Sequence, residues 1–227
     1  MKLLLVGCEY AGTTTLADAI REWAGPAMNI DFRIIHDHFK IPDTKPHGEP
    51  LTEEEIAQFA ALSPRLTEVI QRHDIYYHTP GEGSSGDGIT IGLHIDEAIY
   101  GPLYWDYGKT GVIGDRDVIG RHIEHSIEKW APETVLVHVK ASPEVIARRM
   151  REDPHPYPVV LEKDIEHVLN RFEQEVRRSL IGLRLDLDTS TSTVDETLAE
   201  FAEKIQDFLT PNDLTRMLNR RLAPAAG

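Results

Sequence analysis

The stretch that decides the fold is LLLVGCEYAGTTTLADAI, residues 3–20. It opens with a short apolar run that ends at Gly7, the pattern of a strand buried on both faces. From Thr13 to Ala24 the spacing of the apolar residues predicts a helix. A strand, a glycine-containing loop and a helix N-terminus in this order form an anion site, because backbone N–H groups point at the ligand and the helix end carries about half a positive charge.

Gly7 and Gly12 have the spacing of the phosphate-binding loop G-x-x-x-x-G-K-[ST], but Thr13 occupies the lysine position. Glycine allows the close backbone approach that such a loop requires. Thr14 falls where a hydroxyl binds Mg²⁺, and Thr15 would help to cap the helix. The alternative is a turn between strand and helix that binds nothing. The predicted phosphate-binding residues of the loop are Gly7, Cys8, Glu9, Tyr10, Ala11, Gly12, Thr13, Thr14 and Thr15.

Composition limits the class of protein. The 227 residues suit one α/β domain, expected over residues 1–210, with a C-terminal tail and short helix over 211–227. A formal net charge of −14 argues against a general binder of nucleic acid or of anionic membranes. The single cysteine, Cys8, excludes a disulfide framework and fits a reducing compartment. No secretory leader and no membrane span are expected, so we predict a cytoplasmic protein.

Strands and helices are expected to alternate along the rest of the chain. Strands are predicted over residues 32–36, 89–95, 134–141 and 183–188, and residues 100–120 match no clear pattern. Cap signals predict helix starts after Thr52, Ser63, Ser142 and Thr193. This alternation predicts a mostly parallel five-stranded sheet with helices on both faces, an α/β fold of three layers.

Two downstream segments carry a family resemblance. VLVHVKASPEVIARRMRE (135–152) resembles the strand, turn and arginine-rich lid of the thymidylate-kinase and deoxynucleoside-kinase group. LRLDLDTSTSTVDETLAEFAEKIQDFL (183–209) resembles the final strand and helix of the same kinases. The resemblance implies a P-loop fold and an enzyme that transfers the γ-phosphoryl group of ATP, with Mg²⁺, to a nucleoside, a nucleotide or a similar small acceptor. A homodimer is compatible with it.

The resemblance also implies roles for particular residues. Asp37 matches the acidic residue that contacts the acceptor hydroxyl or takes its proton, and Arg116 matches the arginine that holds the acceptor. Arg148, Arg149 and Arg151 match the arginines of a lid over about 148–160, with Arg148 and Arg151 on the transferring group and Arg149 on the donor nucleotide. Phosphoryl transfer needs cations around three anionic oxygens and little covalent chemistry from the protein. The bland alternative for these arginines is a solvated helix end.

Other polar residues allow more than one interpretation. The cation that replaces the missing lysine could be Lys40, Lys109 or a lid arginine. Asp96 follows a predicted strand and is a candidate Mg²⁺ ligand together with Thr14, although a solvated loop acid explains it equally well. A less favoured metal site would combine His36 and His38 with His94 and Asp96. Aromatic residues could stack on a base or pack under loops. They are Tyr76, Tyr77, Tyr100, Tyr104 and Trp105.

Two rival functions share the same first loop. AGTTTLADAI (11–20) resembles the loop of sulfotransferases that use 3'-phosphoadenylyl sulfate, and DRDVIGRHIEHS (115–126) loosely resembles their 3'-phosphate segment. The spacing differs, however, and Tyr10 stands where those enzymes have a basic residue. The second rival is a nucleotide-binding protein that lost catalysis together with its lysine.

Overall fold

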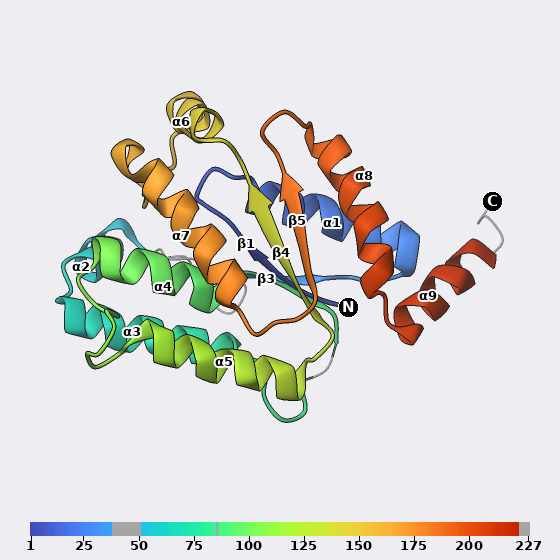
Figure 1. The fold of residues 1–227 in the computed structure, drawn as a ribbon, viewed down its shortest axis with the longest axis horizontal. Coiled ribbons are helices and arrows are strands. Elements are labelled where there is room, and N and C mark those ends of the chain that lie inside the picture. Colours follow the sequence, from blue (N-terminus) through green and yellow to red (C-terminus); the bar gives the residue numbers. More distant parts are fainter. Residues whose placement is uncertain (38–50, 85, 223–227) are drawn as a thin grey trace.

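The computed structural model describes residues 1–37, 51–84 and 86–222. In this part of the chain a single sheet has the strand order β2-β3-β1-β4-β5, and every neighbouring pair is parallel (Figure 1). The predicted fold class, a parallel five-stranded sheet with helices on both faces, is confirmed. The strands are β1 (Lys2–Val6), β2 (Arg33–Asp37), β3 (Gly88–Gly92), β4 (Thr134–Lys140) and β5 (Arg184–Asp188).

Helices cover the two faces of the sheet in separate groups. On one face α1 packs against α8, and on the other α4 packs against α5 and α7 (Figure 1). The helices are α1 (Thr13–Met28), α2 (Glu53–Ala60), α3 (Pro64–His78), α4 (Leu93–Tyr104), α5 (Arg116–Trp130), α6 (Pro143–Glu152), α7 (Ile165–Arg178), α8 (Val194–Lys204) and α9 (Pro211–Leu222), with short 3₁₀ turns at Glu162–Asp164 and Ile205–Phe208.

The core lies around the central strand β1. Its residues 3–6 are buried, as is nearly all of β4 beside it, which explains why both strands are apolar without alternation. Since all five strands are parallel, their carboxyl ends meet at one edge of the sheet. The loop after β1, Asp37 at the end of β2 and the start of α4 after β3 therefore come together there.

The helix caps predicted from the sequence are confirmed. Thr52 and Thr193 each form a capping box with the glutamate three residues later. The Ser63 and Ser142 hydroxyls accept from the third amide of their helices, and a proline follows each serine.

The strand prediction over residues 89–95 is wrong at its end. β3 stops at Gly92, where φ is 91°, and Leu93 has φ of 56°. This left-handed turn sends the chain directly into α4, so Asp96 lies in the first turn of a helix and not in a strand. The two ends of the unassigned stretch 100–120 become the end of α4 and the start of α5.

The C-terminal helix α9 packs against α1. Its Asp213 is buried 3.3 Å from the amino group of Met1, and its Arg216 pairs with Asp87 at 2.9 Å. These bonds attach the helix to the start of β1 and to the loop before β3. Among the described helices, none combines the length and the apolar character that crossing a membrane would demand.

Candidate active site

The loop between β1 and α1 has the geometry of an anion cradle. A Cβ at Gly7 would lie only 2.3 Å from the carbonyl oxygen of Val139, so that position admits glycine alone. Gly12 is the N-cap of α1, with φ of 98° and no side chain to cap the helix. The first amide bonded within the helix is that of Leu16, to the Gly12 carbonyl at 2.9 Å. The amides of Thr13, Thr14 and Thr15 are therefore the unsatisfied donors of the first turn.

A cavity of about 350 Å³ opens over this loop. It joins the end of β1 to residues from α4, from the segment after α6 and from the region after β5. Its lining is Gly7, Glu9, Tyr10, Ala11, Gly12, Thr13, Thr14, Thr15, Leu16, Asp96, Tyr100, Arg149, Glu152, Asp153, His155, Val159, Thr189, Ser192, Val194 and Thr197.

Arg149 brings the positive charge to this loop. Its Nη1 donates to the carbonyl of Tyr10 at 2.9 Å and to the hydroxyl of Thr189 at 3.1 Å, and its Nη2 donates to the Thr189 carbonyl at 2.8 Å. The Nη1 atom lies 3.9 Å from the place where Gly12 would carry a Cβ. These three bonds fix the guanidinium group above the loop, and they do not use all of its N–H donors.

The other candidate cations lie elsewhere in this structure. Arg148 is 56% exposed beside Glu152, and Arg151 is 60% exposed and bonded to Glu162 at 2.6 Å. Neither lines the cavity of the described chain. Lys109 is exposed and pairs with Asp106, and Lys40 lies outside the described residues.

The segment after α6, predicted as the lid, is bound to the loop through Glu9 and Tyr10. The Glu9 carboxylate accepts from His155 Nδ1 at 2.6 Å and from the amides of Val159 and Val160 at 2.7 and 3.0 Å. The Tyr10 ring stacks on His155 with a centroid distance of 4.1 Å, and its hydroxyl accepts from the His155 amide at 3.0 Å. Two loop residues thus close the cavity on that side.

Asp96 is the most deeply buried acid among the residues that line the cavity. It is 4% exposed, and its Oδ1 has no hydrogen-bond partner among the described residues. Burial raises the pKa of this carboxyl, and the negative charges of Asp37, Glu97 and Glu9 raise it further. A bound divalent cation would reverse that effect. Since Asp96 and Thr14 offer hard oxygen ligands to one cavity, the residues fit Mg²⁺.

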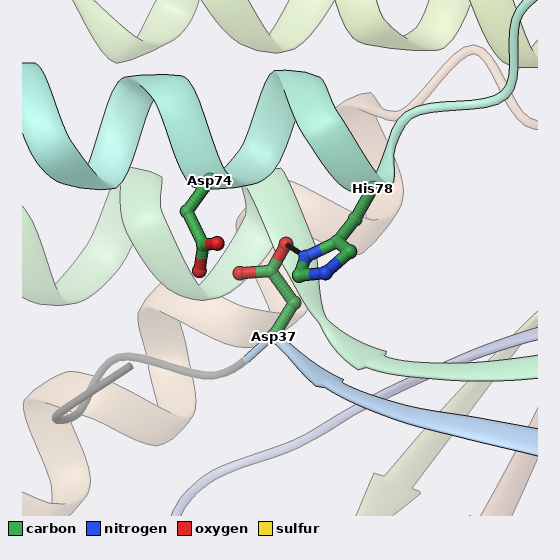
Figure 2. A group of neighbouring side chains, drawn as sticks. All are labelled: Asp37, Asp74 and His78. Atoms are coloured by element: carbon green, nitrogen blue, oxygen red, sulfur yellow. Dashed lines mark hydrogen bonds and ion pairs between the residues drawn. The ribbon is translucent and has the colours of Figure 1, made fainter. Parts of the chain in front are cut away.

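Asp37 lies at the end of β2 and forms a group with two residues of α3. His78 Nδ1 and Asp37 Oδ2 are 2.8 Å apart, and the Asp74 carboxylate faces them one helical turn earlier (Figure 2). Their ligand-type atoms lie within 4.8 Å of one another. Burial alone would lower the pKa of His78, but the hydrogen bond and charge of Asp37, with the charge of Asp74, raise it. Asp37 and Asp74 therefore favour the protonated form of the His78 ring.

Arg116 is placed differently from its predicted role at the acceptor. It is 2% exposed, and it donates to Glu97 at 2.8 Å, to Glu68 at 2.9 Å and to the Gly114 carbonyl at 2.9 Å. The Tyr107 ring lies 4.8 Å below its guanidinium carbon. Asp115 caps α5, so Arg116 is the first residue of that helix. Its guanidinium group bonds to Glu68 of α3 and Glu97 of α4. The positive charge of Arg116 is neutralised by these buried acids.

Replacing Glu97 with glutamine should change how stability depends on pH. Burial raises the pKa of Glu97 to about 7 from its usual 4.5, although Arg116 opposes the shift. Between these values the folded state binds more protons than the unfolded state, so the free energy of unfolding falls as pH rises. We expect this fall, up to about 1.4 kcal/mol per pH unit, to become shallower in Glu97→Gln. Urea unfolding in magnesium-free buffer at several pH values measures it. An equal slope in both proteins contradicts the prediction, and the exposed Glu128→Gln is the control.

The alternative histidine metal site does not assemble in the described chain. His94 Nε2 faces Glu124 Oε1 at 3.2 Å in the interior, and His38 lies outside the described residues. Of the aromatic candidates, Tyr100 lines the cavity, where its hydroxyl accepts from the Glu9 amide at 3.2 Å. Tyr77 is 67% exposed.

Comparison with known proteins finds solved structures with a similar fold. No protein-family model and no curated protein sequence matches the chain. Similar solved structures include the YorR protein of Bacillus subtilis in complex with phosphorylated GDP, at 17% identity and a TM-score of 0.55, covering 92% of this chain and 99% of that one. Deoxyadenosine kinase from M. mycoides with bound dATP has 12% identity and a TM-score of 0.58, covering 91% and 100%. Thymidylate kinase from Candida albicans has 14% identity and a TM-score of 0.57, covering 93% of each chain.

The chain has the P-loop kinase fold. The resemblance predicted from residues 135–152 and 183–209 is confirmed at this level. At these identities the likeness concerns the fold alone, so the chemistry has to be argued from the side chains.

Several residues of this P-loop kinase fold were not singled out from the sequence. His78 and Asp74 lie about 40 residues from Asp37 along the chain, and no local pattern connects them. Thr189 holds Arg149 and also donates to the Ala11 carbonyl at 2.8 Å. One signal was available for it: the DTS sequence directly after the predicted last strand lies at the carboxyl edge of the sheet.

Proposed function

We propose that the protein transfers the γ-phosphoryl group of Mg·ATP to a hydroxyl group of a small uncharged acceptor, of which a nucleoside is the best candidate. The observation that carries this proposal is the pairing of an uncapped helix N-terminus with a fixed guanidinium. The α1 amides and Arg149 face the same cavity, where they would hold and neutralise a polyphosphate.

The acceptor side of the site differs in charge from the donor side. Asp37 lies at the carboxyl end of β2, outside the lining of the cavity over the loop, and the Asp74 carboxylate of α3 faces it. Arg116, which the resemblance assigned to the acceptor, is neutralised by Glu97 and Glu68. An acceptor that already carries a phosphate would meet these acids, whereas sugar hydroxyls can donate hydrogen bonds to them. The charge distribution therefore favours a nucleoside over a nucleotide.

Each residue then has one task. The amides from Gly12 to Thr15 bind the donor phosphates, and Arg149 supplies the charge that lysine supplies in other loops of this type. Thr14 and Asp96 would hold Mg²⁺, which when bound neutralises charge on the β- and γ-phosphate oxygens. Asp37 takes the proton of the acceptor hydroxyl as that oxygen attacks. Arg148 and Arg151 remain candidates for the transferring group, and would reach it only after leaving Glu152 and Glu162.

Binding and turnover together test this proposal. We expect saturable binding of Mg·ATP by calorimetry, followed by formation of ADP and a phosphorylated product when nucleosides are added. Product masses identify the acceptor. Each nucleoside should be phosphorylated at least about ten times faster than its own 5'-monophosphate, because the monophosphate adds charge to an acidic site.

The rival functions predict other outcomes. Transfer from 3'-phosphoadenylyl sulfate, with no transfer from ATP, would replace the kinase by a sulfotransferase. Saturable ATP binding with no product from any nucleoside, nucleotide or sugar would indicate a binding protein without catalysis. A faster reaction with monophosphates would contradict the acceptor assignment alone.

A further inference from the structure

We propose that His78 is a positioning residue for Asp37, fixing the carboxylate by which the acceptor is deprotonated. His78 donates its Nδ1–H to one carboxylate oxygen and leaves the other for the acceptor. This inference rests on the proposed function, because it assumes that Asp37 serves as the base.

The geometry supports this role. The 2.8 Å separation of His78 Nδ1 and Asp37 Oδ2 is that of a charge-assisted hydrogen bond. Asp37 is 4% exposed, so few solvent contacts could hold its carboxylate instead. Figure 2 shows the second oxygen of Asp37 turned away from the imidazole, on the side of Asp74. His78 ends α3 and Asp37 ends β2, two elements that pack against each other, so the bond joins two rigid parts of the fold.

The electrostatic surroundings explain why Asp37 needs such a partner. Asp74 faces it from α3, and Asp96 and Glu97 act on it from α4. Arg33 on β2 acts on His78, and His73 on α3 acts on Asp74. The acids around the Asp37 carboxylate offer it no hydrogen-bond donor when they are ionised, whereas the His78 ring nitrogen is bonded to it.

The same bond competes with a metal ion at this group. A metal held through His78 Nδ1 and Asp37 Oδ2 would displace the hydrogen bond that now joins these two atoms. With Oδ2 of Asp37 hydrogen-bonded to His78, Oδ1 is the oxygen that would take the proton of the acceptor.

Two substitutions at position 78 test the proposal. His78→Leu removes the donor, while His78→Asn places an amide N–H where Nδ1 was. We expect His78→Leu to lower kcat by about 10- to 100-fold with little change in KM, because a misplaced base weakens only the transition state. His78→Asn should recover most of kcat. The exposed His73→Leu on the same helix is the control for general effects on α3.

A double-mutant cycle separates positioning from a structural role. In an Asp37→Asn background, His78→Leu should change kcat by less than about twofold, because its effect acts through the missing carboxylate. Full additivity would overturn the proposal, as would wild-type kcat in His78→Leu. A readout without turnover is the NMR titration of the His78 ring, whose midpoint should fall in Asp37→Asn because the hydrogen bond and the charge of Asp37 raise the pKa of His78. An unchanged midpoint also counts against it. If the wild-type protein phosphorylates no acceptor, the proposed function itself fails.

Discussion

Arg149→Ala is expected to lower kcat/KM for Mg·ATP by about 10²- to 10³-fold, the range found when one preorganised donor to a transferring phosphoryl group is lost. In the structure this guanidinium is the charged group fixed directly above Gly12, in the loop that lacks a lysine. Its removal leaves the donor phosphates with backbone amides and metal alone. Steady-state kinetics with varied ATP measures the loss.

Two neighbours on the same helix provide matched controls for Arg149. Arg148→Ala removes an equal charge from an exposed position, so it should cost less than Arg149→Ala; a kcat/KM within about threefold of wild type would remove Arg148 as a candidate for the transferring group. Arg151→Ala tests the sequence-based prediction, because that residue pairs with Glu162 outside the cavity. A large loss in Arg151→Ala with a small loss in Arg149→Ala would mean that the lid rearranges around the nucleotide. Melting temperatures are needed beside the kinetics, since Arg149 also joins Tyr10 to Thr189.

Asp37→Asn is expected to lower kcat by about 10²- to 10⁴-fold, the usual contribution of a positioned general base. Asparagine keeps the size of the side chain but cannot take the proton of the acceptor. Affinity for Mg·ATP should be nearly unchanged, because Asp37 is not among the residues that line the cavity over the loop. Single-turnover measurements at saturating ATP isolate this step from nucleotide binding.

Two comparisons sharpen the Asp37 prediction. Asp31→Asn, an exposed residue just before β2, should leave kcat unchanged. Wild-type kcat in Asp37→Asn would show that no base is needed at this position, and would leave phosphoryl transfer to positioning and charge alone. Weaker ATP binding with normal kcat would instead assign Asp37 to the metal site.

The sheet and the helix starts were predictable because their causes are local. The apolar run before Gly7 and the Ser-Pro caps at Ser63 and Ser142 act within a few residues, and the structure has each of them. The position at which β3 ends was not predicted, because Leu93 adopts a positive φ and an apolar residue rarely has that conformation.

The site was predictable only in part. Helical spacing favours Arg149 as the inward arginine, because it follows the buried Val145 and Ile146 by four and three residues. That signal is local, and it separates Arg149 from Arg151. The side chain of Arg116 is held by Glu68, which is 48 residues away in the sequence. The side chain of Asp37 is held by His78, which is 41 residues away. Such pairings are properties of the folded chain.

The bonds from Glu9 and Tyr10 to the segment around His155 have a kinetic consequence. The loop that would receive the phosphates also holds its own cover in place, through three hydrogen bonds to one carboxylate and a stacked ring pair. Movement of the segment around His155 away from the loop requires all of these contacts to break, so the rate of that movement depends on Glu9 and Tyr10 as well as on the segment itself.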